Sequence, residues 1–141
     1  MNAERTVCPT SSYHLQLPRD ICEQFDKTVS SFWLKGNPLL LQLSSYLRDD
    51  EKQIGALDRL RERIARNDQN WNIWRNRIHP ATIVDQATAE YRAGDDCVWV
   101  HSYIVWPHLT IYATVSGPEA LVRDKNNWAF RAIKSLAITT H

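Results

Sequence analysis

The sequence predicts an α+β domain in which helices pack on a small antiparallel sheet in the C-terminal half. The 141 residues suffice for a single domain, 1–141, and are too few for two ordinary ones. Residues 97–106 and 109–116 alternate with a period of two and are rich in Val, Ile, Tyr and Trp, which is typical of strands. Apolar residues of several earlier segments recur at helical spacing instead. Helical segments followed by a strand pair indicate the α+β class.

The front of the chain predicts a short strand and then a helix. Residues 12–17 alternate weakly and stop at Pro18, as a strand would. Asp20 is a suitable N-cap, and Glu23 stands three residues on, at the spacing of a capping box. The apolar residues that follow recur at helical spacing: Ile21, Phe25, Val29 and Phe32. The pattern therefore predicts a helix over 20–36.

Residues 37–47 fit two interpretations. Asn37 as N-cap and Pro38 at the first helical position fit a helix. The apolar residues at helical spacing are Leu39, Leu40, Leu43, Tyr46 and Leu47. In a strand, Leu39, Leu41 and Leu43 would share one face instead. The pattern favours the helix and leaves the strand open.

The clearest predicted helix spans 50–66. Asp50 caps it and Gln53 closes a capping box, while acidic residues at its start and arginines at its end complement the helix dipole. Its apolar stripe consists of Ile54, Leu57, Leu60 and Ile64. The stripe predicts that this helix packs on the core through all four residues.

The remaining segments complete the predicted order. Residues 67–79 are polar and predicted to be irregular, and a shorter helix is predicted over 80–92. The two predicted strands are interrupted at Pro107, and a helical region is predicted over 119–138.

Composition narrows the function classes. A net charge of +1 exerts no global attraction toward nucleic acid or an anionic membrane, and scattered glycines exclude a Walker loop or a Rossmann fingerprint, so no cofactor is expected. No window approaches the roughly 18 apolar residues of a membrane span, and no secretory signal is evident. Cys8, Cys22 and Cys97 lack the spacing of a zinc site or a disulfide framework. Free thiols, no metal and a cytoplasmic location are expected.

One motif could carry phosphoester chemistry. Pro107-His108-Leu109-Thr110-Ile111 lies on a predicted strand, where alternation would direct His108 and Thr110 to the same face. His108 could act as acid or base on a phosphate while the Thr110 hydroxyl holds one of its oxygens. A His-x-Thr strand motif preceded by proline resembles the repeated motif of the two-histidine (2H, LigT-like) phosphoesterases. Residues 12–32 and 37–66 are also similar to that family's opening strand and helix and to its first motif strand and following helix.

The resemblance implies an enzyme that binds or cleaves a nucleotide phosphodiester, with His108 and Thr110 catalytic and a nucleotide or RNA end as partner. The family uses two such motifs, one supplying the base and one the acid. Where the first would fall, this chain has Leu40-Leu41-Gln42-Leu43, and His14 and His101 are imperfect substitutes. A central strand at 38–47 would keep this fold possible, whereas a helix would remove it.

A basic and aromatic stretch lies between residues 59 and 79. Trp71 and Trp74 stand there among six arginines and only two acids. The arginines are Arg59, Arg61, Arg63, Arg66, Arg75 and Arg77. Guanidinium and indole groups can bind phosphates and bases, and they also dominate the energetics of protein interfaces, whereas a solvated helix face is the structural alternative. We expect Arg75 and Arg77 to be exposed, with Trp71 or Trp74 partly exposed beside them.

The aromatic content favours a binding protein. Six tryptophans are more than the interior accommodates comfortably, and alternation places Trp99 and His101 on one face of a strand, as in a pocket wall or a partner-facing sheet. The favoured function is a small cytoplasmic protein-binding or inhibitory module, for example a bacterial toxin-neutralising immunity protein, and the phosphoesterase is the alternative. The expected binding residues are Trp71, Trp74, Arg75, Arg77, Trp99, His101 and Trp106.

Overall fold

A seven-stranded antiparallel sheet forms the centre of the computed structural model, which describes residues 3–47 and 54–139. Its strand order is β3-β4-β5-β9-β8-β7-β6. The bounds are β3 (Cys22–Phe25), β4 (Ser30–Trp33), β5 (Leu40–Leu47), β6 (Asn72–Trp74), β7 (Asp85–Arg92), β8 (Val98–Val105) and β9 (Leu109–Gly117). A second antiparallel sheet has the order β1-β2-β10 and consists of β1 (Glu4–Thr10), β2 (Tyr13–Pro18) and β10 (Ala137–Ile138). The helices of the described ranges are α1 (Ala56–Ala65), α2 (Glu119–Arg123) and α3 (Trp128–Lys134).

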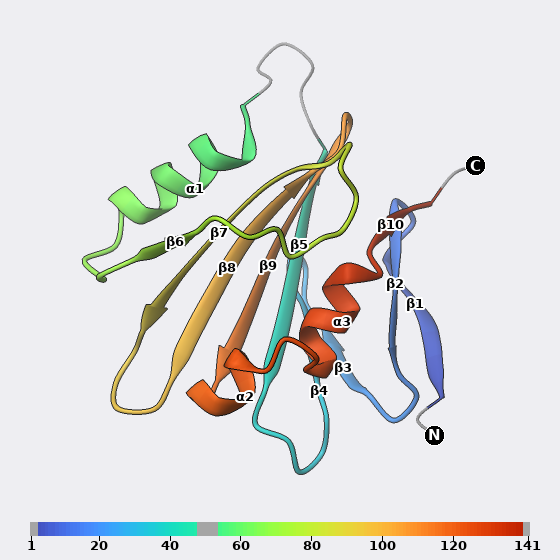
Figure 1. The fold of residues 1–141 in the computed structure, drawn as a ribbon. Helices are drawn as coiled ribbons and strands as arrows, with labels where there is room; N and C mark the ends of the chain where they lie inside the picture. The colour runs from blue at the N-terminus through green and yellow to red at the C-terminus, as the bar shows by residue number, and fades with distance from the viewer. Residues whose placement is uncertain (1–2, 48–53, 140–141) are drawn as a thin grey trace.

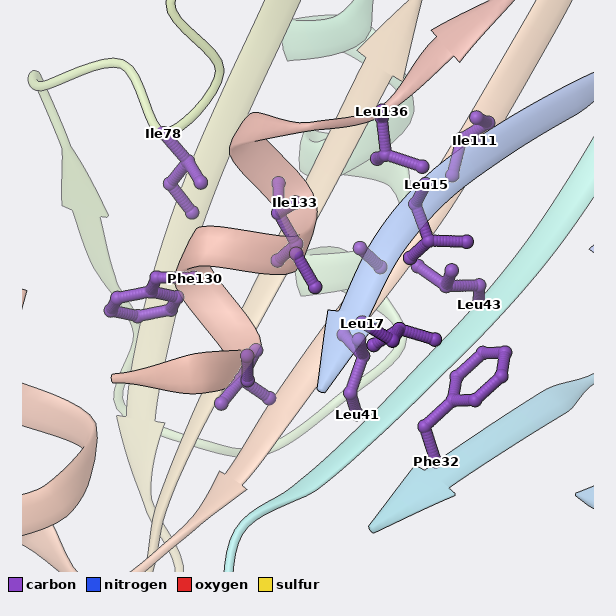
Figure 2. Close-up of a cluster of buried hydrophobic side chains, with 14 of the residues drawn as sticks. Leu15, Leu17, Phe32, Leu41, Leu43, Ile78, Ile111, Phe130, Ile133 and Leu136 are labelled. Carbon is purple, nitrogen blue, oxygen red and sulfur yellow. The ribbon is translucent and has the colours of Figure 1, made fainter. Parts of the chain in front are cut away.

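The main core lies between the central sheet and the layer formed by α3 and the second sheet (Figure 1). Leu17 of β2 lies beside Leu41 of β5 and Phe32 of β4, and Ile133 of α3 faces the same cluster (Figure 2). Leu17, Leu41 and Phe32 are fully buried, so this layer supplies most of the apolar burial that stabilises the fold. No helix in the described ranges is long and apolar enough to cross a membrane.

The opposite face of the sheet carries α1, which packs across β7 and β8 (Figure 1). A smaller apolar cluster forms there, of Ala56, Leu60, Ala87, Ala89, Tyr103 and Val105. Leu57 is 39% exposed, so the predicted packing of α1 through all four residues of its stripe is wrong at this position. The helix begins at Ala56, whose N–H donates to Asp85 Oδ2 at 2.8 Å, and it turns Ala56 and Leu60 toward the sheet. The predicted caps Asp50 and Gln53 lie outside the described residues.

Several predicted elements agree with the structure. The chain is an α+β protein, and the strands predicted at 12–17, 97–106 and 109–116 correspond to β2, β8 and β9. The helix predicted over 50–66 contains α1, and the region 119–138 contains α2 and α3.

Other predicted elements are wrong. The helix predicted over 20–36 is the β3–β4 hairpin, and the helix predicted over 80–92 gives way to β7. Residues 37–47, where the pattern favoured a helix, contain β5, which pairs with both β4 and β9. The predicted small sheet of the C-terminal half is therefore a larger one, because strands from both halves of the chain join it. Tertiary pairing overrides local spacing in these segments.

Candidate functional site

Unpartnered polar groups gather on the face of the sheet that α1 covers. In the described part of the chain, four buried side-chain atoms lack a hydrogen-bond partner: Arg59 Nε, Trp71 Nε1, His101 Nε2 and Thr110 Oγ1. Thr110 lies opposite Val105 in the sheet, and Trp71 packs against the cluster under α1, so both belong to this face. Buried polar atoms are nearly always hydrogen-bonded in proteins. The clustering of these unpartnered polar atoms on one face of the sheet marks that face as a candidate binding site.

His101 stands at the centre of this face and is enclosed by aromatic rings. The ring centroids lie 4.7 Å from Trp71, 5.4 Å from Tyr91, 6.0 Å from Trp99 and 5.7 Å from Tyr112. The Nδ1 atom shares a hydrogen bond with the Tyr112 hydroxyl. Burial, aided by the positive charge of Arg63, lowers the pKa of His101 to about 4. The imidazole is therefore neutral at physiological pH.

Arg63 connects this cluster to α1. Its Nε donates to the Tyr103 hydroxyl at 2.8 Å, and its guanidinium carbon lies 3.9 Å from the centroid of the Tyr112 ring. Such a cation–π contact stabilises the arginine without neutralising it. A cavity of about 330 Å³ opens beside it, lined by Tyr46, Arg59, Glu62, Arg63, Arg66, Asn67 and Tyr103. Arginines and hydroxyls converging on a cavity are chemically suited to anions.

A second concavity, of about 670 Å³, lies on the other face, between β6 and the α2–α3 region; we call it the basic groove. Trp74 Nε1 donates to Glu90 Oε1 at 2.7 Å, and the Trp74 ring stands edge-on to Phe130 with centroids 6.0 Å apart. Arg123 donates to the same oxygen of Glu90, which is 5% exposed. These contacts hold Trp74 in place, with part of its surface still open to solvent.

The structure divides the predicted binding residues among three places. Ring contacts bring Trp71, Trp99 and His101 together on the face of the sheet that carries α1, which agrees with the expected shared face of Trp99 and His101. Trp74, Arg75 and Arg77 line the basic groove, and both arginines are exposed. Arg77 is nevertheless anchored, because its Nη2 donates to the carbonyl oxygens of Ala81 and Val84. Trp106 packs against His79 at the main core, with ring centroids 5.5 Å apart, and belongs to neither place.

His108 and Thr110 do not share the face of a strand, so that structural expectation is wrong. His108 is exposed in the turn between β8 and β9, where the Trp106 N–H donates to the Leu109 carbonyl at 2.8 Å. Thr110 is fully buried on β9. His14 lies on β2, in the second sheet, and His101 lies on β8, on the face of the sheet that carries α1. The histidines considered as a catalytic pair are therefore on separate elements, and His101 is the one on the face of Thr110.

Several residues of these sites were not identified from the sequence. Tyr91, Tyr103 and Tyr112 surround His101 and Arg63, and Glu90 and Arg123 hold Trp74. Alternation on 109–116 places Tyr112 on the face of Thr110, which was an available signal. The pairing register of β8 and β9, which places Tyr103 opposite Tyr112, cannot be read from the local sequence of either strand.

Comparison with known proteins supports the fold alone. No protein-family model matches the chain, and no curated protein matches its sequence. The chain is similar to a 1.50 Å crystal structure of a protein from Bacteroides thetaiotaomicron VPI-5482, with a TM-score of 0.60 and 12% sequence identity. The match covers 92% of this chain and 46% of that one, so this chain spans about half the length of that protein.

Proposed function

We propose that the chain is a small protein-binding or inhibitory module that receives an acidic protein surface in the basic groove, as a bacterial toxin-neutralising immunity protein could. The composition of the groove carries this proposal. Its cationic residues are Arg75, Arg77, Arg123, Lys125 and Lys134. Among the described residues, Glu90 is the one acid that lines the groove, and this carboxylate already accepts hydrogen bonds from Trp74 and Arg123.

The positive charge of the groove is local. The whole chain has a net charge of only +1, whereas the described lining of the groove has five cations beside one paired acid, which is a distinct electrostatic feature. No carboxylate in the described residues pairs with Arg75, Lys125 or Lys134. Complementary charge accelerates association and selects partners. An acidic surface is therefore the complementary partner.

Trp74 has the properties of an interface anchor. Its ring is fixed by Glu90 and Phe130, so little side-chain entropy would be lost on binding. Trp and Arg are enriched among the residues that dominate interface energies. Proteins that bind single-stranded nucleic acid stack successive bases on several aromatic platforms, whereas Trp74 is the groove's single partly exposed aromatic among the described residues. This favours a protein partner over nucleic acid.

The cysteines support a cytoplasmic location for this module. Cys8, Cys22 and Cys97 are all free thiols, and Cys8 is exposed. Free thiols persist in reducing compartments.

Replacing Trp74 by alanine should weaken binding of an acidic peptide on the order of 30-fold, because a central aromatic anchor contributes about 2 kcal/mol or more. The probe is a fluorescein-labelled peptide rich in Glu and Phe, measured by anisotropy at low and physiological salt. Arg75→Glu should weaken it as well. Lys35→Glu is the matched charge control, since Lys35 is exposed in the β4–β5 loop and lies outside the groove.

Two results would contradict the groove proposal. One is affinity for the peptide that is unchanged in both Trp74→Ala and Arg75→Glu. The other is tighter, sequence-independent binding of a single-stranded oligonucleotide with a steep salt dependence, which would indicate a nucleic-acid partner.

The two-histidine-like phosphoesterase is a second hypothesis, favoured by one observation: residues 38–47 contain the central strand β5 rather than a helix. Under this hypothesis the protein hydrolyses a 2′,3′-cyclic nucleotide and His108→Ala abolishes turnover, because the imidazole acts as acid or base. A chromatographic assay of both proteins tests it. Absence of turnover by the wild type, or an unchanged rate in His108→Ala, would end this hypothesis.

A further inference from the structure

The cavity beside α1 presents cationic groups on one helix face. Arg59, Arg63 and Arg66 line it, and their spacing of four and three residues places them on the same side of α1 and its C-cap. The described residues provide no ion-pair partner for any of the three. The helix dipole stabilises positive charge near the C-terminus of α1, which accounts for arginines at positions 63 and 66. The dipole does not explain why Arg59 Nε is buried without a hydrogen-bond partner.

The tyrosines of the cavity add donors. The Tyr103 oxygen accepts a hydrogen bond from Arg63 Nε, so its own O–H remains available to donate. Tyr46 also lines the cavity and is 45% exposed, so its ring offers an apolar surface that a ligand can reach from solvent. Arg63 is held by Tyr103 and by the Tyr112 ring, and this preorganises its guanidinium.

The charge balance of the lining matches one class of anion. Among the described residues that line the cavity, three guanidinium groups and the one carboxylate, of Glu62, leave two positive charges. A phosphate monoester carries about −1.5 to −2 at pH 7 and three acceptor oxygens, which guanidinium groups bind in bidentate geometry. The cavity of about 330 Å³ falls within the range of small-ligand sites.

We propose that this cavity binds a phosphate group, either as free phosphate or on a small phosphomonoester. Arg59, Arg63 and Arg66 surround the phosphate oxygens, the Tyr103 hydroxyl donates to one of them, and the ring of Tyr46 contacts the organic part. The site lies on the opposite face of the sheet from the basic groove and does not depend on the proposed function.

Isothermal titration calorimetry in phosphate-free buffer tests the site by measuring the binding of inorganic phosphate, AMP and uncharged adenosine. We expect phosphate or AMP to bind and adenosine not to bind. Arg59→Gln and Arg66→Gln should each weaken binding on the order of tenfold, because each removes a charge-assisted hydrogen bond. Arg61→Gln is the matched control: it makes the same change on the same helix, but Arg61 is exposed and does not line the cavity. Its affinity should stay within about twofold of the wild type.

Comparing AMP with inorganic phosphate distinguishes the two possible ligands, a phosphomonoester and free phosphate. Tighter binding of AMP than of phosphate indicates a phosphomonoester, and equal binding indicates free phosphate; both support the site. No binding of either at millimolar concentration would overturn it. An equal loss in Arg61→Gln and Arg59→Gln would also overturn it, because binding would then reflect the general charge of α1. Circular dichroism of each variant verifies that it is folded.

Discussion

Replacing Leu60 by alanine is expected to lower the free energy of unfolding by about 2–5 kcal/mol, the usual cost of truncating a buried leucine. Leu60 is fully buried between α1 and the strands β7 and β8. Leu57→Ala, on the same helix, should cost less than about 1 kcal/mol, because that side chain is 39% exposed. Urea denaturation of both variants measures the difference, and the chemical change is the same in each.

The pair tests the orientation of α1. Equal losses at both positions, or a larger loss at Leu57, would mean that another face of the helix packs on the sheet. The orientation matters for function, because α1 positions Arg59 and Arg63 at the cavity. A partial loss of phosphate binding in Leu60→Ala, with Leu57→Ala unaffected, would link the packing of the helix to the site.

The local sequence predicted those strands whose own composition and alternation are typical of a β-strand. The strands β8 and β9 are rich in β-branched and aromatic residues, which alternate between two covered faces of the sheet. The β7 strand lacks this signal. Its sequence, DQATAEYR, contains Ala, Gln and Glu, which favour helices, and its four central residues are all buried. The conformation of β7 is set by its pairing with β8 over its full length, and the local sequence of β7 does not reveal this pairing.

The candidate sites were predictable to the same extent. Alternation within one strand was sufficient to place Trp99 and His101 together. The meeting of His101 with Trp71 and Tyr112 joins three separate segments, and it depends on the β8–β9 register and on the path of the chain after α1. Likewise, Glu90 and Arg123 are 33 residues apart in the sequence and meet only in the fold. Local patterns identify candidate residues, whereas tertiary pairing decides which of them share a site.

Acidification is expected to destabilise the protein through His101. The pKa of this imidazole falls from its ordinary value of 6.5 to about 4 in the folded protein, mainly because of burial and secondarily because of Arg63. A lowered folded-state pKa means that the unfolded chain takes up the proton first as the pH falls. The contribution is therefore fully present above pH 6.5 and is lost as the pH falls to about 4. The shift corresponds to about 3 kcal/mol.

Urea denaturation of the wild type and His101→Gln between pH 7.5 and 4 isolates this contribution. Carboxylates such as Glu119, whose pKa is lowered by Arg92, titrate in both proteins, so the difference between the two curves belongs to His101. That difference should be flat above pH 7 and should change steadily below 6.5, with the wild type losing more stability. Parallel curves throughout would show that the imidazole is not held neutral by the fold.

A second variant separates the two causes of the lowered pKa. Arg63→Gln removes the nearby positive charge and leaves His101 enclosed by Trp71, Tyr91 and Tyr112. Because burial is the larger cause, the pKa of His101 should rise only part of the way toward 6.5, and the pH range of destabilisation should narrow without vanishing. NMR titration of the His101 ring protons measures this directly. A full return to the ordinary value would assign the effect to Arg63 and would mean that the aromatic rings do not exclude water from the imidazole.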